Sequence, residues 1–569
     1  MLNEIDKVLA EQFKLPGFRP GQKHVIEALL NGRSAAAVFP TGGGKSLCYQ
    51  LPAVLLPGLT VVVSPLIALM KDQIDALAAR GIAAERLDST LTTEQYRSVM
   101  DRARSGDLRM LYVAPERFSN ERFRESIRKI RVALFAVDEA HCISEWGHNF
   151  RPDYLKLPQF ARLCNAERML ALTATATDAV LADICRVFQI ESDDAVRTTF
   201  YRANLTIRMT ATSPTSRDAR LLKMLKDQPP GPGIIYVTLQ KTAEELAVWL
   251  REENISARAY HAGLEDEERT SVQEWFLASQ NGIVVATIAF GMGIDKANIR
   301  YVYHYNPPKS LENFAQEIGR AGRDGEPAIC QSFLCYGDLK VLEEFAKRDT
   351  PTESAVASFV KDVFSLRDSF DVSLHEMAAQ HGMRFPVVRT LLTYLELQEY
   401  LEGGTPFYSS YKFQPLKSSA QILARFEGER REFLHQLLRQ AVKLKTWFRI
   451  DADKAARVIG CDRDRVIAAL DYLHQQQMLE LKAEGTRLRY RRLRKPDSVP
   501  ALAKKLFEML QNREARELAR LQQVADLVSY EGCQVSALGA YFGEPTIDRC
   551  GHCTWCESMA GQPVGSTAG

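Results

Sequence analysis

Short apolar runs rich in β-branched residues alternate with helical patterns over the first 345 residues, and this alternation constrains the fold more than any other feature. Between residues 34 and 200 such runs recur at 36–39, 60–64, 110–113, 134–137 and 169–173. The pattern restarts at 233–237 and continues at 283–287 and 301–303. Strands that are spaced by helices predict parallel sheets. We therefore expect two α/β units side by side, residues 1–210 and 211–347.

The chain changes character after about residue 350, where helical patterns prevail and few buried strands are expected. Residues 348–415 are predicted to form two short helices and a β-wing, and residues 416–497 repeat that order. Periodicity with a turn fits a winged helix and a plain helical bundle equally well, so both alternatives stay open. Residues 498–558 are assigned to a cysteine-bearing helical element, and residues 559–569 to a disordered tail.

The composition is that of an ordinary globular protein, with 46% hydrophobic and 25% charged residues among 569. A formal net charge of +2 neither requires nor excludes a polyanionic partner, so a nucleic-acid surface would have to be a local patch. No run of about twenty apolar residues occurs, and residues 1–11 mix charged with apolar side chains, unlike a secretory signal. We therefore expect an intracellular protein without a membrane partner.

A glycine-rich segment, Pro-Thr-Gly-Gly-Gly-Lys-Ser at residues 40–46, follows the first predicted strand and precedes a helical pattern at 47–55. Backbone N–H groups of such a loop curl around phosphate oxygens, and the helix N-terminus adds partial positive charge. Lys45 would bond the β- and γ-phosphates, and the Ser46 hydroxyl would ligate Mg²⁺. A glycine-rich turn without a ligand is the alternative, but it does not explain why Lys-Ser is in register with the helix. The predicted phosphate-binding residues are Thr41, Gly42, Gly43, Gly44, Lys45 and Ser46.

Two adjacent carboxylates, Asp138 and Glu139, end the apolar strand predicted at 134–137. The carboxyl ends of parallel strands line the ligand crevice, so both side chains should face the nucleotide. Asp138 would hold Mg²⁺ through water, and Glu139 would polarise the attacking water. An acidic pair at a strand end is more often a helix cap or a solvated loop, but the phosphate loop earlier in the same unit favours catalytic roles.

The second α/β unit carries Gln-Glu-Ile-Gly-Arg-Ala-Gly-Arg-Asp-Gly at residues 316–325. Arg320 and Arg323 are three residues apart, which predicts one helical face, and the small residues between them allow backbones to approach closely. One of the two could then act as an arginine finger on a nucleotide that the first unit binds. A surface helix with ion pairs is the alternative.

Four of the eleven cysteines crowd the C-terminal region: Cys533, Cys550, Cys553 and Cys556. Four thiolates close a tetrahedral Zn²⁺ site and leave no position for water, which predicts a structural site. Free or redox-active thiols are the alternative for CxxC pairs.

The densest basic run of the chain lies on the wing strand predicted at 479–493. Alternate residues of a strand share a face, so Arg489 and Arg491 are candidates for contacts with nucleic-acid phosphates. A solvated basic face is the alternative.

Eight ordered motifs in this chain resemble those of the RecQ-type helicases of superfamily two. They lie at residues 18–22, 41–46, 64–70, 112–117, 138–141, 172–176, 289–296 and 316–325. The resemblance implies an α/β fold of two RecA-like parallel-sheet lobes, followed by a mostly helical, winged-helix-like region and a C-terminal zinc-binding helical element. It also implies that Gln22, with Arg19 nearby, reads the adenine of ATP. Arg323 would be the finger, with Arg320 and Gln316 beside the phosphates.

Residues 142–154, which follow the carboxylates, resemble the family's aromatic-rich loop that reports DNA binding to the ATP site. Trp146 and Phe150 can stack on unpaired bases, each contributing about 1–3 kcal/mol, and Arg151 can pair with phosphate. His148 belongs to the same predicted DNA-contacting group. Packing of these aromatic rings in a core is the alternative. Outside the loop, the resemblance implies that two further residues couple nucleotide to nucleic acid, namely Thr173 and Thr175.

The resemblance implies an ATP-dependent DNA helicase that moves 3′ to 5′ on single-stranded DNA and unwinds tailed duplexes in recombination and repair. ATP, Mg²⁺ and Zn²⁺ are the expected cofactors, and repair or single-strand-binding proteins are expected partners. The expected compartment is the bacterial cytoplasm, at the nucleoid, or a eukaryotic nucleus. The family places its zinc element directly after the second lobe, whereas about 170 residues intervene here. An RNA helicase on the same motor and a DNA-annealing protein with a vestigial motor remain as alternatives.

Overall fold

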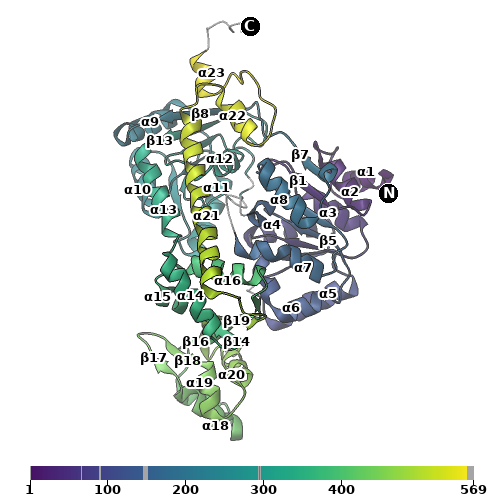
Figure 1. Cartoon of the computed structure of the whole chain (residues 1–569), viewed down its shortest axis with the longest axis vertical. Helices are drawn as coiled ribbons and strands as arrows, with labels where there is room; N and C mark the ends of the chain where they lie inside the picture. The colour runs from purple at the N-terminus through teal and green to yellow at the C-terminus, as the bar shows by residue number, and fades with distance from the viewer. Residues whose placement is uncertain are drawn as a thin grey trace. The chain divides into compact units, whose positions relative to one another are not determined.

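The computed structural model describes residues 2–65, 67–88, 91–144, 151–291, 294 and 296–559. The chain divides into two compact units (Figure 1). The first unit comprises Met1–Phe118, Arg122–Thr350 and Met509–Gly569, and the second comprises Ser119–Glu121 and Pro351–Glu508. Most of the second unit is therefore an insertion between two parts of the first, and we call it the inserted unit. The tail predicted at 559–569 lies, apart from Met559, outside the described residues.

The N-terminal lobe of the first unit is built on a seven-stranded sheet of order β3-β4-β2-β5-β6-β1-β7, whose described pairings are all parallel. The strands are β1 (Ala35–Val38), β2 (Leu59–Val63), β3 (Ala84–Leu87), β4 (Met110–Val113), β5 (Val132–Val137), β6 (Met169–Thr173) and β7 (Ala195–Arg197). The helices are α1 (Leu2–Glu11), α2 (Gln22–Leu30), α3 (Leu47–Leu55), α4 (Ile67–Ala78), α5 (Thr93–Ser105), α6 (Glu121–Ile127), α7 (Leu157–Leu163) and α8 (Asp178–Phe188), with 3₁₀ turns η1 (Pro115–Ser119), η2 (Ala140–Ile143), η3 (Pro152–Lys156) and η4 (Ser192–Asp194). Val61 and Val63 pack in one hydrophobic core and Val62 in another, because both faces of a parallel sheet are buried.

The second lobe is a six-stranded sheet of order β10-β11-β9-β12-β13-β8, again parallel in its described pairings. The strands are β8 (Leu205–Ala211), β9 (Gly233–Tyr236), β10 (Ala257–Tyr260), β11 (Ile283–Ala286), β12 (Tyr301–His304) and β13 (Ala328–Leu334). The helices are α9 (Pro214–Asp227), α10 (Gln240–Glu252), α11 (Asp266–Ala278), α12 (Leu311–Ile318) and α13 (Tyr336–Arg348). The two predicted parallel-sheet lobes are confirmed, although β8 begins before residue 211, where we expected the second lobe to start.

The C-terminal part of the first unit packs on the second lobe. It contains the end of α21 (Val499–Val528), then α22 (Gln534–Tyr541) and α23 (Thr554–Ser558). Val524, Leu538 and Cys553 share one hydrophobic cluster with Ile207 of β8 and Phe314 of α12. Residues 509–559 are called the zinc element below.

The inserted unit combines helices with a sheet of order β14-β19-β16-β18-β17, in which β15 also pairs with β19 and whose described pairings are all antiparallel. Its strands are β14 (Ser369–Val372), β15 (Leu401–Gly403), β16 (Phe407–Pro415), β17 (Val442–Lys443), β18 (Phe448–Asp451) and β19 (Leu479–Arg492). Its helices are α14 (Glu353–Ser365), α15 (Leu374–His381), α16 (Phe385–Leu397), α17 (Ser419–Leu423), α18 (Gly428–Arg439), α19 (Ala452–Ile459) and α20 (Arg463–Gln475).

One long strand, β19, joins two helix-and-strand groups of the inserted unit. Its first part pairs with β16, and its last residues pair with β14 and β15. Because β16 also pairs with β18, the second group begins before residue 416, and the strand pairing crosses the border predicted there. The second group is thus nested inside the first, between β15 and the end of β19.

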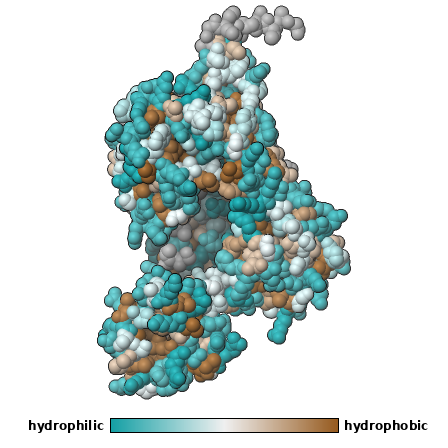
Figure 2. All heavy atoms as spheres, turned by 90° about the vertical axis from the view of Figure 1, so that its left-hand side faces the viewer, coloured by the Kyte–Doolittle hydropathy of each residue, from teal (hydrophilic) through white to brown (hydrophobic). Residues whose placement is uncertain are grey.

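The molecular face drawn in Figure 2 is covered mainly by hydrophilic side chains, with apolar ones in small groups. Among the described residues, no helix combines the length and the apolar character that crossing a membrane requires.

Candidate nucleotide site and zinc centre

The glycine loop between β1 and α3 has the backbone of a phosphate cradle. Gly42 and Gly44 have φ of 84° and 78°, values that a residue with a Cβ rarely adopts. A Cβ on Gly43 would lie 2.9 Å from the Pro40 carbonyl oxygen, so the loop admits no side chain there. Lys45 is folded back and donates from Nζ to the Phe39 carbonyl at 3.1 Å. Burial lowers the pKa of Lys45, which an anionic ligand would oppose.

Gln22, at the start of α2, braces this loop. Its Nε2 donates to the carbonyl of Gly44 at 2.9 Å, while its Oε1 accepts from the Arg19 backbone N–H at 2.8 Å. The Arg19 guanidinium donates to the Gly42 carbonyl. Both side chains predicted to read adenine therefore touch the phosphate loop, and their contact with a base stays a prediction.

Asp138 and Glu139 follow β5 at the carboxyl edge of the sheet. Burial, with the neighbouring charge of Glu139, raises the pKa of Asp138 to about 7. Burial opposes ionisation of Glu139 too, but the hydrogen bond and charge of His141 outweigh it and lower the pKa of Glu139 to about 2. A carboxylate pair of this kind would gain from a divalent cation, and Asp138 with the Ser46 hydroxyl fits the oxygen ligands that Mg²⁺ takes.

His141, which was not predicted as a site residue, links the carboxylates to β6. Its Nδ1 lies 3.3 Å from Glu139 Oε2 and 2.9 Å from Thr173 Oγ1. The Thr173 hydroxyl in turn donates to the Thr175 carbonyl at 3.1 Å. His141, Thr173 and Thr175 are all buried. The Asp-Glu-Ala-His order of residues 138–141 was the signal that could have identified this contact.

Arg320 and Arg323 reach the site from a turn, which corrects the helix predicted for them. Helix α12 ends at Ile318, and the following residues form turns because Gly322 and Gly325 take positive φ. Arg320 is buried and donates to the Gly291 carbonyl. The predicted close approach of backbones is present, since a Cβ on Gly319 would lie 3.2 Å from Thr41 Cβ. Gln316 is buried within α12.

A cavity of about 690 Å³ opens between the glycine loop and this turn, a size that suits a nucleotide. Arg19, Thr41 and Gly42 line it from the first lobe, and Gly322 and Arg323 line it from the second. A Cβ on Gly42 would lie 3.5 Å from Arg323 Cδ, so the two lobes meet at the phosphate loop. Another wall is formed by the end of β7 and the segment that connects the lobes, represented by Val196, Arg197, Thr198, Thr199, Arg202 and Asn204.

The predicted DNA-contacting loop falls mainly outside the described residues, which exclude 145–150 and so Trp146, His148 and Phe150. Arg151 is described and lies half-buried before η3. Beyond it, the Tyr154 hydroxyl donates to the Asp138 carbonyl at 3.2 Å, which ties the end of this loop to the carboxylates.

The four C-terminal cysteines come together as predicted. Their Sγ atoms all lie within 4.8 Å of one another, and Cys550 and Cys556 are 3.9 Å apart. Zn–S bonds of about 2.3 Å in a tetrahedron place sulfurs about 3.8 Å apart, so the cluster fits zinc. Backbone N–H groups of His552 and Cys556 donate to Cys550 and Cys553 at 3.4 Å, as expected of thiolate ligands.

Most basic side chains of strand β19 pair with acidic side chains inside the inserted unit. Arg487 donates to Glu376 at 3.0 Å, Arg491 to Glu402 at 2.9 Å, and Arg492 to Asp368 at 2.6 Å. Arg489 lies over the Phe407 ring, 5.0 Å from its centroid. These contacts reduce the positive charge that the strand offers to phosphates, so Arg489 and Arg491 stay predictions as DNA contacts.

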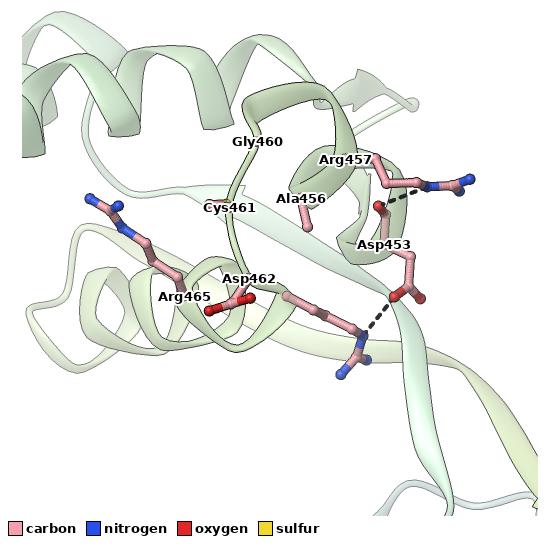
Figure 3. Close-up of a pocket in the computed structure, with 8 residues that line it drawn as sticks. Asp453, Ala456, Arg457, Gly460, Cys461, Asp462 and Arg465 are labelled. Atoms are coloured by element: carbon pink, nitrogen blue, oxygen red, sulfur yellow. Dashed lines mark hydrogen bonds and ion pairs between the residues drawn. The ribbon is translucent and has the colours of Figure 1, made fainter.

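A concavity at the turn between α19 and α20 also carries arginines (Figure 3). Arg463 pairs with Asp453 at 3.2 Å, and Arg465, which points away from Arg457 in this view, pairs with Glu429 at 2.7 Å. Asp462 also lines the concavity, so the positive and negative charges there nearly cancel. The concavity therefore does not favour a charged ligand of either sign.

Comparison with known protein families matches three segments of the chain. Residues 19–184 match the DEAD/DEAH box helicase family, residues 216–325 the helicase conserved C-terminal domain, and residues 487–557 the RecQ zinc-binding family. The four-cysteine cluster is therefore a RecQ-type zinc site.

Relatives extend this match over most of the chain. It is 36% identical over 384 residues to the probable ATP-dependent DNA helicase RecS of Bacillus subtilis, covering 67% of this chain and 77% of that protein. It is 44% identical over 346 residues to the ATP-dependent DNA helicase RecQ of Haemophilus influenzae, covering 60% of this chain and 56% of that protein. It is 34% identical over 538 residues to the ATP-dependent DNA helicase Q-like 5 of Arabidopsis thaliana, covering 91% of this chain and 58% of that protein.

The chain spans little more than half the length of the second and third of these proteins. Its two lobes and its zinc element each match a helicase family model. The chain belongs to the RecQ family of ATP-dependent DNA helicases.

Proposed function

We propose that this chain is an ATP-dependent DNA helicase that moves 3′ to 5′ along single-stranded DNA and unwinds tailed duplexes during recombination and repair. The observation that carries the proposal is the cavity in which Thr41 and Gly42 of one lobe face Arg323 of the other. Only a nucleotide that touches both lobes can make their closure depend on its hydrolysis.

Residues in and beside the cavity would perform the steps of this cycle. Lys45 leaves the Phe39 carbonyl and bonds the β- and γ-phosphates of ATP. Glu139 orients and polarises the attacking water, and Arg323 sets its charge against the transferring phosphoryl group when the lobes close. Ser46 and Asp138 would hold Mg²⁺, which would neutralise the charge of the phosphates.

Thr173 and Thr175 would couple DNA binding to the nucleotide cavity. The supporting observation is the buried chain of contacts from Glu139 through His141 to the Thr173 hydroxyl. Trp146 and Phe150 would stack on unpaired bases, with Arg151 and His148 beside the strand. Arg489 and Arg491 would add weaker contacts from the inserted unit.

Partners and place in the cell follow from the same proposal. Single-stranded and tailed duplex DNA are the substrates, and repair or single-strand-binding proteins are the partners. The site of action would be the bacterial nucleoid or a eukaryotic nucleus. Each duplex step to be opened costs about 1.4 kcal/mol in stacking, which hydrolysis of ATP can supply.

The test is an ATPase assay with single-stranded DNA and with RNA of the same sequence and length. The wild type should be stimulated by DNA far more than by RNA, and Lys45→Ala should show neither basal nor stimulated turnover. Equal stimulation by RNA would favour an RNA helicase. Turnover by Lys45→Ala at the wild-type rate would exclude the proposed site.

A further inference from the structure

Residues 198–204 connect the two lobes between β7 and β8. The zinc element contacts this segment along its length. Glu544 accepts a hydrogen bond from the Phe200 backbone N–H and one from the Thr199 hydroxyl at 3.2 Å. The Phe200 and Phe542 rings lie 5.5 Å apart. Further along, the Tyr201 hydroxyl lies 3.1 Å from His552 Nε2. The connection is therefore bonded at successive residues rather than free.

The same turn of the zinc element also reaches the first lobe. The Phe542 carbonyl accepts from Arg197, which pairs with Asp178 at 2.7 Å. Gly543 has a φ of 76°, and any side chain there would collide with this ion pair. A glycine is thus required at the point where the zinc element approaches the lobe.

Glu544 is placed firmly by the end of α22. The Gly543 N–H donates to the Ala540 carbonyl at 3.0 Å and the Glu544 N–H to the Gly539 carbonyl at 3.0 Å, the pair of bonds that closes a Schellman motif. At the other end of α22, the zinc ligand Cys533 is the N-cap residue of the helix. One short helix therefore runs from the metal to the carboxylate.

On its other side, the connecting segment forms a wall of the nucleotide cavity, to which Thr198, Thr199 and Arg202 contribute. We propose that Glu544 is a positioning residue for ATP: it holds the connecting segment against the cavity and thereby makes nucleotide binding depend on the folded zinc element. The inference rests on the proposed function, because it assigns ATP to that cavity. Glu544 itself does not line the cavity.

Coupling between two sites is reciprocal, which gives the proposal a signature that a purely structural role lacks. If the zinc element supports nucleotide binding through Glu544, nucleotide must in turn stabilise the zinc element. A non-hydrolysable ATP analogue should therefore slow the release of zinc from the wild type to a chromogenic chelator, and this protection should vanish in Glu544→Ala.

The experiment compares Glu544→Ala, Glu544→Gln and Asp548→Ala with the wild type. Asp548 is an exposed carboxylate in the same loop and serves as the matched control. Zinc content, the Kd of a fluorescent ATP analogue, and KM and kcat for ATP are measured for each. Loss of charge-assisted hydrogen bonds at a half-buried site should raise Kd and KM about tenfold in Glu544→Ala. The amide of Glu544→Gln should restore part of the loss, with full zinc content throughout.

The proposal is overturned if zinc-loaded Glu544→Ala keeps the wild-type Kd and KM, or if nucleotide protects its zinc as well as it does in the wild type. A wild type that binds no nucleotide would instead refute the proposed function. The two failures are therefore distinguished by the first titration.

Discussion

Replacing His141 tests the contact chain between the ATP site and the DNA-coupling threonines. The His141 ring is only 2% exposed, and its Nδ1 lies between Thr173 Oγ1 at 2.9 Å and Glu139 Oε2 at 3.3 Å. A buried hydrogen bond contributes about 1 kcal/mol net, and one to a charged group about 1.5–3 kcal/mol. The His141→Ala variant should therefore lose about 2.5–4 kcal/mol of coupling, equivalent to a fall of about 10²- to 10³-fold in DNA-stimulated kcat.

The assay is steady-state ATPase with and without single-stranded DNA, together with nucleotide Kd. Basal turnover should fall as well, because His141 also contacts Glu139, but it should fall less than the DNA-stimulated turnover. Nucleotide Kd should change by less than about threefold, because the glycine loop holds the phosphates. Thr173→Val removes the other end of the contact and should cost about tenfold in stimulation on its own.

A double-mutant cycle decides whether the two residues act as one unit. If they do, His141→Ala with Thr173→Val should be no worse than His141→Ala alone, which is a coupling energy of about 1.4 kcal/mol or more. Losses that simply multiply in the double variant would refute the contact chain. So would a His141→Ala enzyme that DNA stimulates as strongly as the wild type.

Three further outcomes follow from the same contacts. Arg323→Ala should lower DNA-stimulated kcat by about 10³-fold while nucleotide Kd stays within about tenfold, and an equal loss in both would contradict a role in the transition state. Cys556→Ser should lose zinc and expose the zinc element to protease, as measured by metal content and limited proteolysis; a zinc-free variant that resists cleavage would contradict a structural site. Arg492→Ala should lower the free energy of unfolding of the inserted unit by about 1.5–3 kcal/mol, because the guanidinium of this side chain, which is only 8% exposed, bonds Asp368 and the carbonyls of Phe364 and Leu366. Arg489→Ala should cost less than about 0.5 kcal/mol in the same urea titration, and equal losses in the two variants would contradict this account.

The lobes and the glycine loop were predictable because their signals are local. A run such as 134–137, followed at once by Asp138 and Glu139, contains both the strand and its functional end within a few residues. The spacing of the four C-terminal cysteines likewise predicts a tetrahedral zinc site. The spacing of Arg320 and Arg323 predicts a helix, but residues 319–325 form turns because Gly322 and Gly325 adopt positive φ.

The rest depends on contacts between distant residues, which no local pattern contains. Asp368 and Glu402, which neutralise Arg492 and Arg491, lie about 120 and 90 residues away in the chain. The strands β16 and β19 pair across two intervening helix pairs, so the border between the helical groups could not be drawn from periodicity. Glu544 meets Phe200 across more than 340 residues, and a lone glutamate in a loop gives no hint of that.

The central claim, that hydrolysis in the cavity between the lobes drives strand separation, is tested most directly with tailed duplexes. Unwinding by the wild type and by Glu139→Gln is followed with a fluorophore and quencher on duplexes that carry a 3′ or a 5′ single-stranded tail. The account predicts that the wild type separates the 3′-tailed duplex in the presence of ATP, that the 5′-tailed duplex stays paired, and that Glu139→Gln separates neither. Separation of the 3′-tailed duplex by Glu139→Gln at the wild-type rate would contradict it.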